Sequence, residues 1–390
     1  MIARRPCIGT EPALLCLFMG LAAATCLPGG RARADEAKAL AIHAGRIETL
    51  AGEAIEDGVV LVVEGRIEAV GAELEVPEGA EVLDARDAVV YPGLVNAVSR
   101  LGLSAASGGK AASNPHHRVA DELYPFQDAY KRAARAGFTT LALVPGRPGI
   151  AGQAALVRTV AGSAEEMLLS DRGPLVVAFR ADTETRNTIK GALDAANRSP
   201  STEGKTAPLA WAVQGEIPTV VTCAGAGEAA HVLKLLEPYK NMHLVLSSPG
   251  GDIHRIADRL GERKASIVVP ARISFERYTR TRINIPRMLT EAGAKVACRP
   301  ASDSVAGCEA FRQAMAELVR AGLDREMALK AMTIHPAEML GLDYRLGSLE
   351  QGKDANLIIL DGDIFDARAE VLRVLIEGET VYDAAWGGLR

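Results

Sequence analysis

The middle of the chain alternates short apolar runs with amphipathic segments. The apolar runs have the length of buried strands and cover residues 138–144, 175–179, 219–222, 243–247, 266–270 and 295–298. The amphipathic segments show helical spacing and cover residues 228–236, 253–262, 285–292, 310–320 and 325–332. Because fully buried strands that alternate with helices are typical of parallel α/β sheets, this pattern predicts an α/β middle region.

Both flanks of that region follow a different pattern, in which short strands are joined by tight turns. Near the start, strand-like residues 59–63 and 66–71 flank the turn signal Glu64-Gly65. Near the end, residues 371–382 indicate a hairpin around Gly378, after a strand at 355–360. The sequence therefore predicts two β-rich ends around a long α/β middle.

The first residues differ again, with a basic start, an apolar run and a small-residue site. Arg4 and Arg5 precede the apolar residues 13–24, and Ala32-Arg33-Ala34 fits a cleavage site. This arrangement predicts a cleavable signal peptide at residues 1–34 and a periplasmic or secreted protein. An uncleaved anchor is the alternative, but the run is shorter than the ~20 residues that span a bilayer. We therefore expect no stable membrane insertion after cleavage.

Charge and cysteine content narrow the classes of partner. The mature chain would carry a net charge of −8, since the signal holds four of the 44 basic and one of the 49 acidic residues. That balance argues against nucleic acid and anionic membranes as partners. Cys223, Cys298 and Cys308 remain after cleavage. An odd number implies no disulfide framework, although one pair could form in an oxidising compartment.

Several motifs resemble those of one enzyme family in sequence order. They are Asp57 to Gly71, Tyr91 to Gly102, Ala136 to Thr140, Val144 to Gln153, Ala331 to Leu342 and Gly347 to Leu357. Together they are similar to motifs of the amidohydrolase superfamily, in particular its imidazolonepropionase-related, metal-dependent hydrolases.

The resemblance implies a fold and domain boundaries. Such proteins have a (β/α)8 TIM-like barrel and a small composite β-sandwich built from both chain ends. The barrel would cover residues 93–343, and the β-sandwich residues 35–92 and 344–390. From the hydrophobic pattern alone, an open doubly wound sheet is an equally good architecture.

The resemblance also implies metal positions, and most of them have changed here. The first strand would end in two histidines, where this chain has Val98 and Arg100. Further histidines would stand at Thr222 and Ala224 and at Ser247 or Ser248; the candidate for the last ligand, an aspartate that also acts as general base, is Asp303. One aspartate cannot hold zinc, which needs several N, O or S donors. We therefore predict no cofactor, and a zinc-like divalent metal only if the chain is an active hydrolase.

A few other residues are candidates for the pocket. His116 and His117 lie in a polar loop on the predicted active-site face, where they could contact a ligand or simply face solvent. Cys223 stands between the altered positions, either as a nucleophile or as a buried structural thiol. Asp303 could pair with Arg100 or Arg299 in the emptied site, and Arg100 could clamp a carboxylate.

Three functions follow as expectations. The first is an exported homologue without metal chemistry that serves as a binding or scaffold protein and could have an active homologue as its partner. The second is a working hydrolase of C–N bonds with a site altered around Asp303, His116, His117 and Cys223. The third is a small-molecule binding protein that uses Arg100, Thr222 and Ser248 in the old pocket. Homo-oligomer formation is an expectation by analogy with the family alone.

Overall fold

The computed structural model describes residues 39–104, 109–276 and 278–386. The predicted signal peptide at residues 1–34 lies outside these ranges. The chain divides into Met1–Glu36 and Ala37–Arg390, and all described residues belong to the second unit. None of the described helices is long and apolar enough to cross a membrane.

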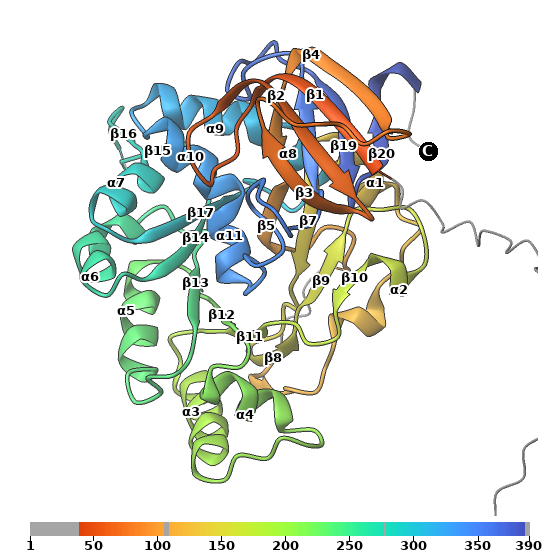
Figure 1. Ribbon diagram of the computed structural model, residues 1–390. Coiled ribbons are helices and arrows are strands. Elements are labelled where there is room, and N and C mark those ends of the chain that lie inside the picture. Colours follow the sequence, from red (N-terminus) through yellow and green to blue (C-terminus); the bar gives the residue numbers. More distant parts are fainter. Residues whose placement is uncertain (1–38, 105–108, 277, 387–390) are drawn as a thin grey trace, which may run out of the picture. The chain divides into compact units, whose positions relative to one another are not determined.

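The two β-rich ends pair in one seven-stranded sheet, the composite sheet, whose order is β20-β19-β18-β4-β1-β2-β3. Its strands are β1 (Ala39–Ile47), β2 (Ile55–Val63), β3 (Arg66–Gly71), β4 (Glu81–Pro92), β18 (Leu357–Leu360), β19 (Val371–Ile376) and β20 (Glu379–Asp383). In Figure 1 the orange first strands and the blue last strands lie side by side. The predicted strands at both ends are confirmed, and side chains of both ends, such as Ile42 and Leu357, share one buried core.

A tight turn in this sheet explains one glycine of the sequence pattern. Glu64 and Gly65 join β2 to β3 with φ of 51° and 78°. A Cβ atom on Gly65 would lie 2.7 Å from the carbonyl oxygen of Glu377, in the turn between β19 and β20. Glycine is therefore required both by the backbone angle and by the close approach of the second turn.

The middle region contains two sheets. One has the order β10-β9-β7-β5 and the other β17-β14-β13-β12-β11-β8-β6. Their strands are β5 (Leu94–Ser99), β6 (Ala112–Ser113), β7 (Phe138–Leu143), β8 (Gly149–Gln153), β9 (Ala155–Arg158), β10 (Leu168–Ser170), β11 (Leu175–Ala178), β12 (Thr219–Thr222), β13 (Leu244–Ser247), β14 (Ser266–Pro270) and β17 (Lys295–Arg299). The five strands β11 to β14 and β17 pair in parallel, and so do β5 and β7. A short hairpin, β15 (Ser274–Phe275) and β16 (Arg282–Ile283), follows β14.

One stretch of the middle differs from the sequence expectation. The glycine- and proline-rich residues 145–153 have the sequence pattern of a loop, but they include β8, which pairs antiparallel with β11. After Ala154, β9 pairs antiparallel with β7, so this run links the two sheets. Gly149 and Gly152 have φ of 90° and 133°. These glycines conceal a strand in the sequence pattern because glycine is usually depleted from strands.

The two sheets enclose one common interior. Val176, Val220, Val245 and their equivalents on β14 and β17 form a buried cluster with Val95 and Ala97 of β5. The residues that alternate with them, such as Val177 and Val221, pack instead with the helices. Strand residues two apart share a face, so the interior-facing row runs through strands of both sheets, and β17 lies against β5.

Helices cover the outer side of the strands (Figure 1). They are α1 (Asp128–Arg135), α2 (Ala164–Met167), α3 (Thr183–Arg198), α4 (Ala207–Gln214), α5 (Ala226–Leu235), α6 (Ala257–Glu262), α7 (Ile285–Glu291), α8 (Val305–Glu309), α9 (Phe311–Arg320), α10 (Arg325–Met332) and α11 (Ile334–Met339). The predicted helices at 228–236, 285–292, 310–320 and 325–332 are confirmed. Side chains cap several of them; Asp182 accepts from the backbone N of Thr185 at 2.7 Å at the start of α3.

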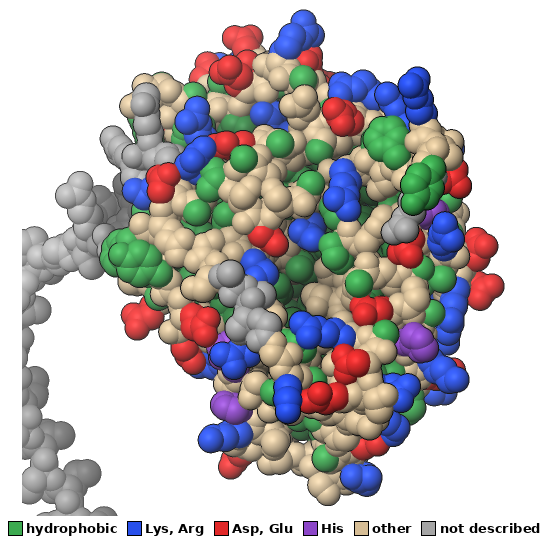
Figure 2. Space-filling view, turned by 180° about the vertical axis from the view of Figure 1, so that it is seen from behind, with side chains coloured by type: hydrophobic (Ala, Val, Ile, Leu, Met, Phe, Trp, Pro, Cys, Tyr) green, Lys and Arg blue, Asp and Glu red, His purple; other side chains and the backbone are tan. Residues whose placement is uncertain are grey.

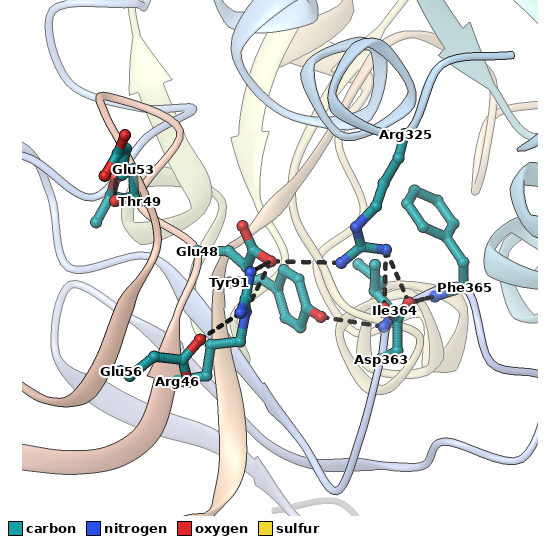
Figure 3. Close-up of polar contacts among 10 residues, drawn as sticks. All are labelled: Arg46, Glu48, Thr49, Glu53, Glu56, Tyr91, Arg325, Asp363, Ile364 and Phe365. Atoms are coloured by element: carbon teal, nitrogen blue, oxygen red, sulfur yellow. Dashed lines mark hydrogen bonds and ion pairs between the residues drawn. The ribbon is translucent and has the colours of Figure 1, made fainter.

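A network of ion pairs, the junction cluster, joins the composite sheet to α10 (Figure 3). Glu48, which follows β1, accepts hydrogen bonds from Arg46 Nε at 3.1 Å and from Arg325 Nη2 at 3.3 Å. Arg325 also pairs with Asp363 at 2.8 Å, and the hydroxyl of Tyr91 accepts from the backbone N of Ile364. The chain's two ends and its last helices are therefore held together by charged groups.

Candidate functional site

The strand ends of the middle region carry a polar layer above an apolar interior. Thr222 is in register with Ser247, and Ser247 with Val268. Thr222 and Ser247 each lie two residues beyond a valine of the interior cluster, so their side chains face the same interior. Arg299 lies two residues beyond Ala297 of that cluster. Hydroxyl groups thus occupy two of the inward positions where the resemblance led us to look for metal ligands, and the Arg299 guanidinium faces the same interior.

The first two expected metal positions are filled without a donor. Val98 is 6% exposed and packs in the interior cluster. The guanidinium of Arg100 donates from Nη1 to the Val144 carbonyl at 2.9 Å and from Nη2 to the Ser104 carbonyl at 2.6 Å. Its side chain is therefore anchored on the loops that follow β5 and β7, with three N–H donors still available on the fork.

Asp303 lies close to Arg100, but the contact differs from the one expected. Its Oδ1 accepts from the backbone N of Arg100 at 3.1 Å and lies 3.9 Å from Arg299 Nη1. The carboxylate is about one third exposed, with a side-chain exposure of 34%. Of the two expected partners, the Arg100 guanidinium is turned toward the two carbonyls instead. The long pairing with Arg299 is present.

Arg299 is the least satisfied charged group of this region. It is 9% exposed, and its Nε has no hydrogen-bond partner among the described residues. Nη1 donates to the carbonyl of the adjacent Pro300 at 3.2 Å. Burial lowers the pKa of the Arg299 guanidinium, and the nearby charge of Arg272 lowers it further, while Asp303 acts in the opposite direction.

Cys223 and Ser248 lie together just beyond β12 and β13, and both are buried. Burial raises the pKa of the Cys223 thiol to about 12, with a further increase from the charge of Glu228, and a hydrogen bond with Ser248 opposes the shift only in part. Such a thiol is un-ionised at neutral pH and is a poor nucleophile. Cys298 and Cys308 are also buried, and all three cysteines are free.

The two neighbouring histidines have different surroundings. His117 is half-buried, with Nε2 3.6 Å from Glu122 Oε1, whereas His116 is exposed. His117 and Arg100 line one cavity of about 530 Å³, with Tyr124 and Arg147. The structure therefore brings Arg100 and His117 to one cavity, while His116, Thr222, Cys223 and Ser248 are absent from its described lining.

A second cavity, of about 680 Å³, lies beyond the ends of β12 and β13. Its lining includes Ala224, Glu228, Asp252 and His254. Glu228 Oε2 accepts from the backbone N of Ala224 at 2.6 Å, and Asp252 Oδ1 from Ala226 at 3.1 Å. These carboxylates hold the loops in place. Figure 2 shows that the face turned away in Figure 1 has a hollow bordered by Lys and Arg side chains.

The residues at the strand ends do not fit a zinc-like metal. Among the described residues, no group of three or more His, Cys, Asp or Glu side chains is placed to hold a metal ion. The inward positions offer two hydroxyls and a guanidinium. The carboxylates of this region, on Asp303, Glu228 and Asp252, already accept from backbone N–H groups. A permanent cation cannot act as a ligand and repels a metal ion.

Comparisons with known proteins agree on a family. A sequence model of the Amidohydrolase family matches residues 213–381. The structure is similar to a solved amidohydrolase from Thermotoga maritima MSB8, with a TM-score of 0.75 and 25% identity over 88% of this chain and all of that one. The chain is therefore similar to amidohydrolases, in sequence over residues 213–381 and in fold over most of its length.

More distant similarities concern the fold or a short segment. An adenosine deaminase from Xanthomonas campestris with bound zinc has a TM-score of 0.54 at 17% identity, covering 88% of this chain and 93% of that one. The N-acetylglucosamine-6-phosphate deacetylase of Rattus norvegicus is 40% identical over 68 residues, which are 17% of this chain. The match spans about 15% of the length of that curated relative. The structural similarity therefore concerns the α/β fold, and these comparisons do not transfer an activity.

Sequence reasoning undervalued two residues of this site. Arg299 was considered only as a partner of Asp303, although its position two residues after Ala297 in an apolar strand places it inward. Arg147, in a glycine- and proline-rich loop, has no ion pair among the described residues and lines the cavity beside Arg100. The spacing of two residues from Ala297 could have identified Arg299 as an inward residue. No sequence feature identifies Arg147 as a cavity residue.

Proposed function

We propose that this amidohydrolase-superfamily protein does not use metal-dependent hydrolysis and acts as a binding protein for a small molecule or a partner subunit. The observation that carries the proposal is the exchange of donors for non-donors at the inward strand ends. Val98 closes one metal position with a buried apolar group, and the Arg299 guanidinium occupies the interior beside Asp303. The guanidinium at this place repels a cation.

The ligand site of this proposal is the cavity of about 530 Å³ beside the first strand ends. Such a volume accommodates a small organic molecule. Arg100 and Arg147 provide positive charge, His117 and Glu122 a polar pair, and Tyr124 an apolar surface. A carboxylate-bearing molecule fits this lining because an arginine fork binds planar oxyanions with paired hydrogen bonds.

The proposal extends to architecture and location. We infer a closed (β/α)8 barrel over residues 93–343 with a composite β-sandwich from residues 35–92 and 344–390. The common interior of the two middle sheets and the pairing of both chain ends support this arrangement. We further propose export through a cleaved signal at residues 1–34, to the periplasm or beyond the cell. That segment lies outside the described residues, so only its sequence supports the proposal.

The test is metal analysis together with turnover. Protein purified without chelator is expected to contain less than about 0.1 equivalents of zinc, manganese, iron, nickel or cobalt, since the donors that such metals require are missing. The same sample is expected to release no amine from N-acetylated sugar phosphates, the class named by the deacetylase relative. Inductively coupled plasma mass spectrometry and amine detection provide the two readouts.

A stoichiometric metal that resists dialysis would overturn this proposal and favour the active C–N hydrolase. An Asp303→Asn variant then distinguishes a catalytic aspartate from a structural one, since only the former is needed for turnover. Turnover without metal that disappears in Cys223→Ser would also overturn it. Metal-free, inactive protein that is stabilised against heat by a carboxylate ligand supports the binding function.

A further inference from the structure

The buried guanidinium of Arg299 has fewer partners than its donors require. Its Nε is buried without a partner among the described residues, and the closest carboxylate, on Asp303, is 3.9 Å from Nη1. Nearly all buried polar groups in proteins are hydrogen-bonded, and each exception calls for an explanation. A charged donor raises the cost of a missing partner further.

Two hydroxyl groups face the same interior as this guanidinium. Thr222 on β12 is in register with Ser247 on β13. The pair of Pro270 on β14 and Arg299 on β17 lies two residues farther along its strands than this register. Ser247 is buried and Thr222 is half-buried. Both can donate to an acceptor placed above them, because a hydroxyl hydrogen rotates to suit its partner. Three side chains with donors therefore face one interior from β12, β13 and β17.

The charge balance of this layer favours an anion. Arg299 and Arg272 are close enough for Arg272 to disfavour the charged form of Arg299. Asp303 is the carboxylate that faces both Arg100 and Arg299, and it is partly exposed to water. Around Arg299 the nearest charges, Arg272 and Asp303, therefore leave an excess of positive charge, while Glu228 and Asp252 lie farther along, beyond the ends of β12 and β13. An added anion would reduce this excess.

We propose that Arg299, Thr222 and Ser247 form a subsite for a small oxyanion, a carboxylate or a phosphate group, at the inward strand ends. The site deepens the proposed function, because it names the group by which the bound molecule is recognised. Arginine binds both kinds of oxyanion with charge-assisted hydrogen bonds. The two hydroxyl groups can donate hydrogen bonds to the remaining oxygen atoms of the anion. The 11% of the Arg299 side chain that remains exposed gives a small ligand access.

The test uses isothermal titration calorimetry of the whole mature chain with inorganic phosphate and, separately, with acetate, in a chloride buffer. Saturable binding of at least one of the two is expected. Arg299→Met should weaken it about 10- to 100-fold, the effect of one charge-assisted hydrogen bond. Thr222→Val, which keeps the shape, should weaken it roughly threefold to tenfold. Phosphate and acetate compared with each other show which oxyanion is preferred.

A matched control separates a specific loss from general charge removal. Arg312, on α9, is a half-buried arginine whose pKa burial also lowers, and it donates from Nη2 to the Ala369 carbonyl at 3.0 Å, away from the strand ends. Arg312→Met should bind phosphate or acetate as the wild type does. Arg299→Lys keeps the charge but not the fork, and should retain weakened binding, which covers the case in which Arg299→Met does not fold.

The outcomes distinguish this inference from the proposed function. If metal-free protein binds neither anion up to about 20 mM, a range in which affinity would be negligible, the oxyanion subsite is wrong while the non-metal proposal stands. Equal binding by Arg299→Lys, Arg312→Met and wild type would also overturn the subsite. A stoichiometric metal in the same protein would overturn the proposed function first.

Discussion

Arginine side chains form the centre of two regions of this molecule, and they are paired very differently. In the junction cluster, Arg325 contacts two carboxylates, on Glu48 and Asp363, at 3.3 and 2.8 Å. At the strand ends, Arg299 is more deeply buried but lies 3.9 Å from Asp303 and has an unpaired Nε among the described residues. The more buried arginine has the poorer partners.

The pKa directions of the two arginines show the consequence. Burial acts to lower the pKa of Arg325, but the hydrogen bond and charge of Asp363 outweigh it, and the pKa rises. For Arg299 burial dominates and the pKa falls. Carboxylates therefore stabilise the charged junction, whereas the strand ends contain a charge that their own residues do not compensate. A structural role explains the first region, and the proposed oxyanion subsite would account for the second.

The contrast between the two regions would not hold if the strand ends contained a nucleophile. The reactivity of the three buried thiols tests this. At pH 8 the three cysteines should react with iodoacetamide about 1000-fold more slowly than a free thiol, because burial raises each pKa from 9.0 to about 12. Mass spectrometry of native and urea-unfolded protein measures both rates. Rapid labelling of Cys223 alone in the native protein would identify a nucleophile at the strand ends.

The same thiols set a pH dependence of stability. The folded pKa values lie above the unfolded ones, so the unfolded state ionises first as pH rises. The stabilising contribution is therefore complete below about pH 9 and declines between pH 9 and 12. Urea unfolding at pH 8 and at pH 10 checks the sign. A higher unfolding free energy at pH 10, at constant denaturant dependence, would contradict the buried thiols.

The sequence predicted the strands of both regions better than their contacts. Val176, Val220 and Val245 were recognisable as buried strand residues because local hydrophobic runs determine them. The antiparallel β8 was missed because Gly149 and Gly152 weaken the strand pattern, although contacts with β11 fix it. The direction of the Arg100 side chain could not be predicted, because it depends on two carbonyls, of Val144 and Ser104, in loops that the sequence does not position.

Glu48 is the carboxylate at the centre of the junction cluster, and its removal tests how much that cluster stabilises the fold. Glu48→Ala removes the carboxylate that Arg46 and Arg325 share. We expect a loss of about 2 kcal/mol in the free energy of unfolding. This is the size of charge-assisted hydrogen bonds between a carboxylate and arginines that are themselves partly exposed. The shift of the urea midpoint at constant slope measures it. The exposed neighbour Glu53 is the control, since Glu53→Ala should change stability by less than about 0.5 kcal/mol.

The smallest expected effect has the opposite sign and contrasts the two arginines directly. Arg299→Met, in a chloride buffer, should raise the free energy of unfolding by about 1 kcal/mol, because an apolar side chain of similar length replaces a weakly paired buried charge. Arg325→Met should lower it by about 1 kcal/mol, because buried Glu48 loses a partner. Adding phosphate should stabilise the wild type but not Arg299→Met, since only the native state would hold the anion. If Arg299→Met were instead destabilised in both buffers, the guanidinium would be a structural element like Arg325, and the contrast between the regions would disappear.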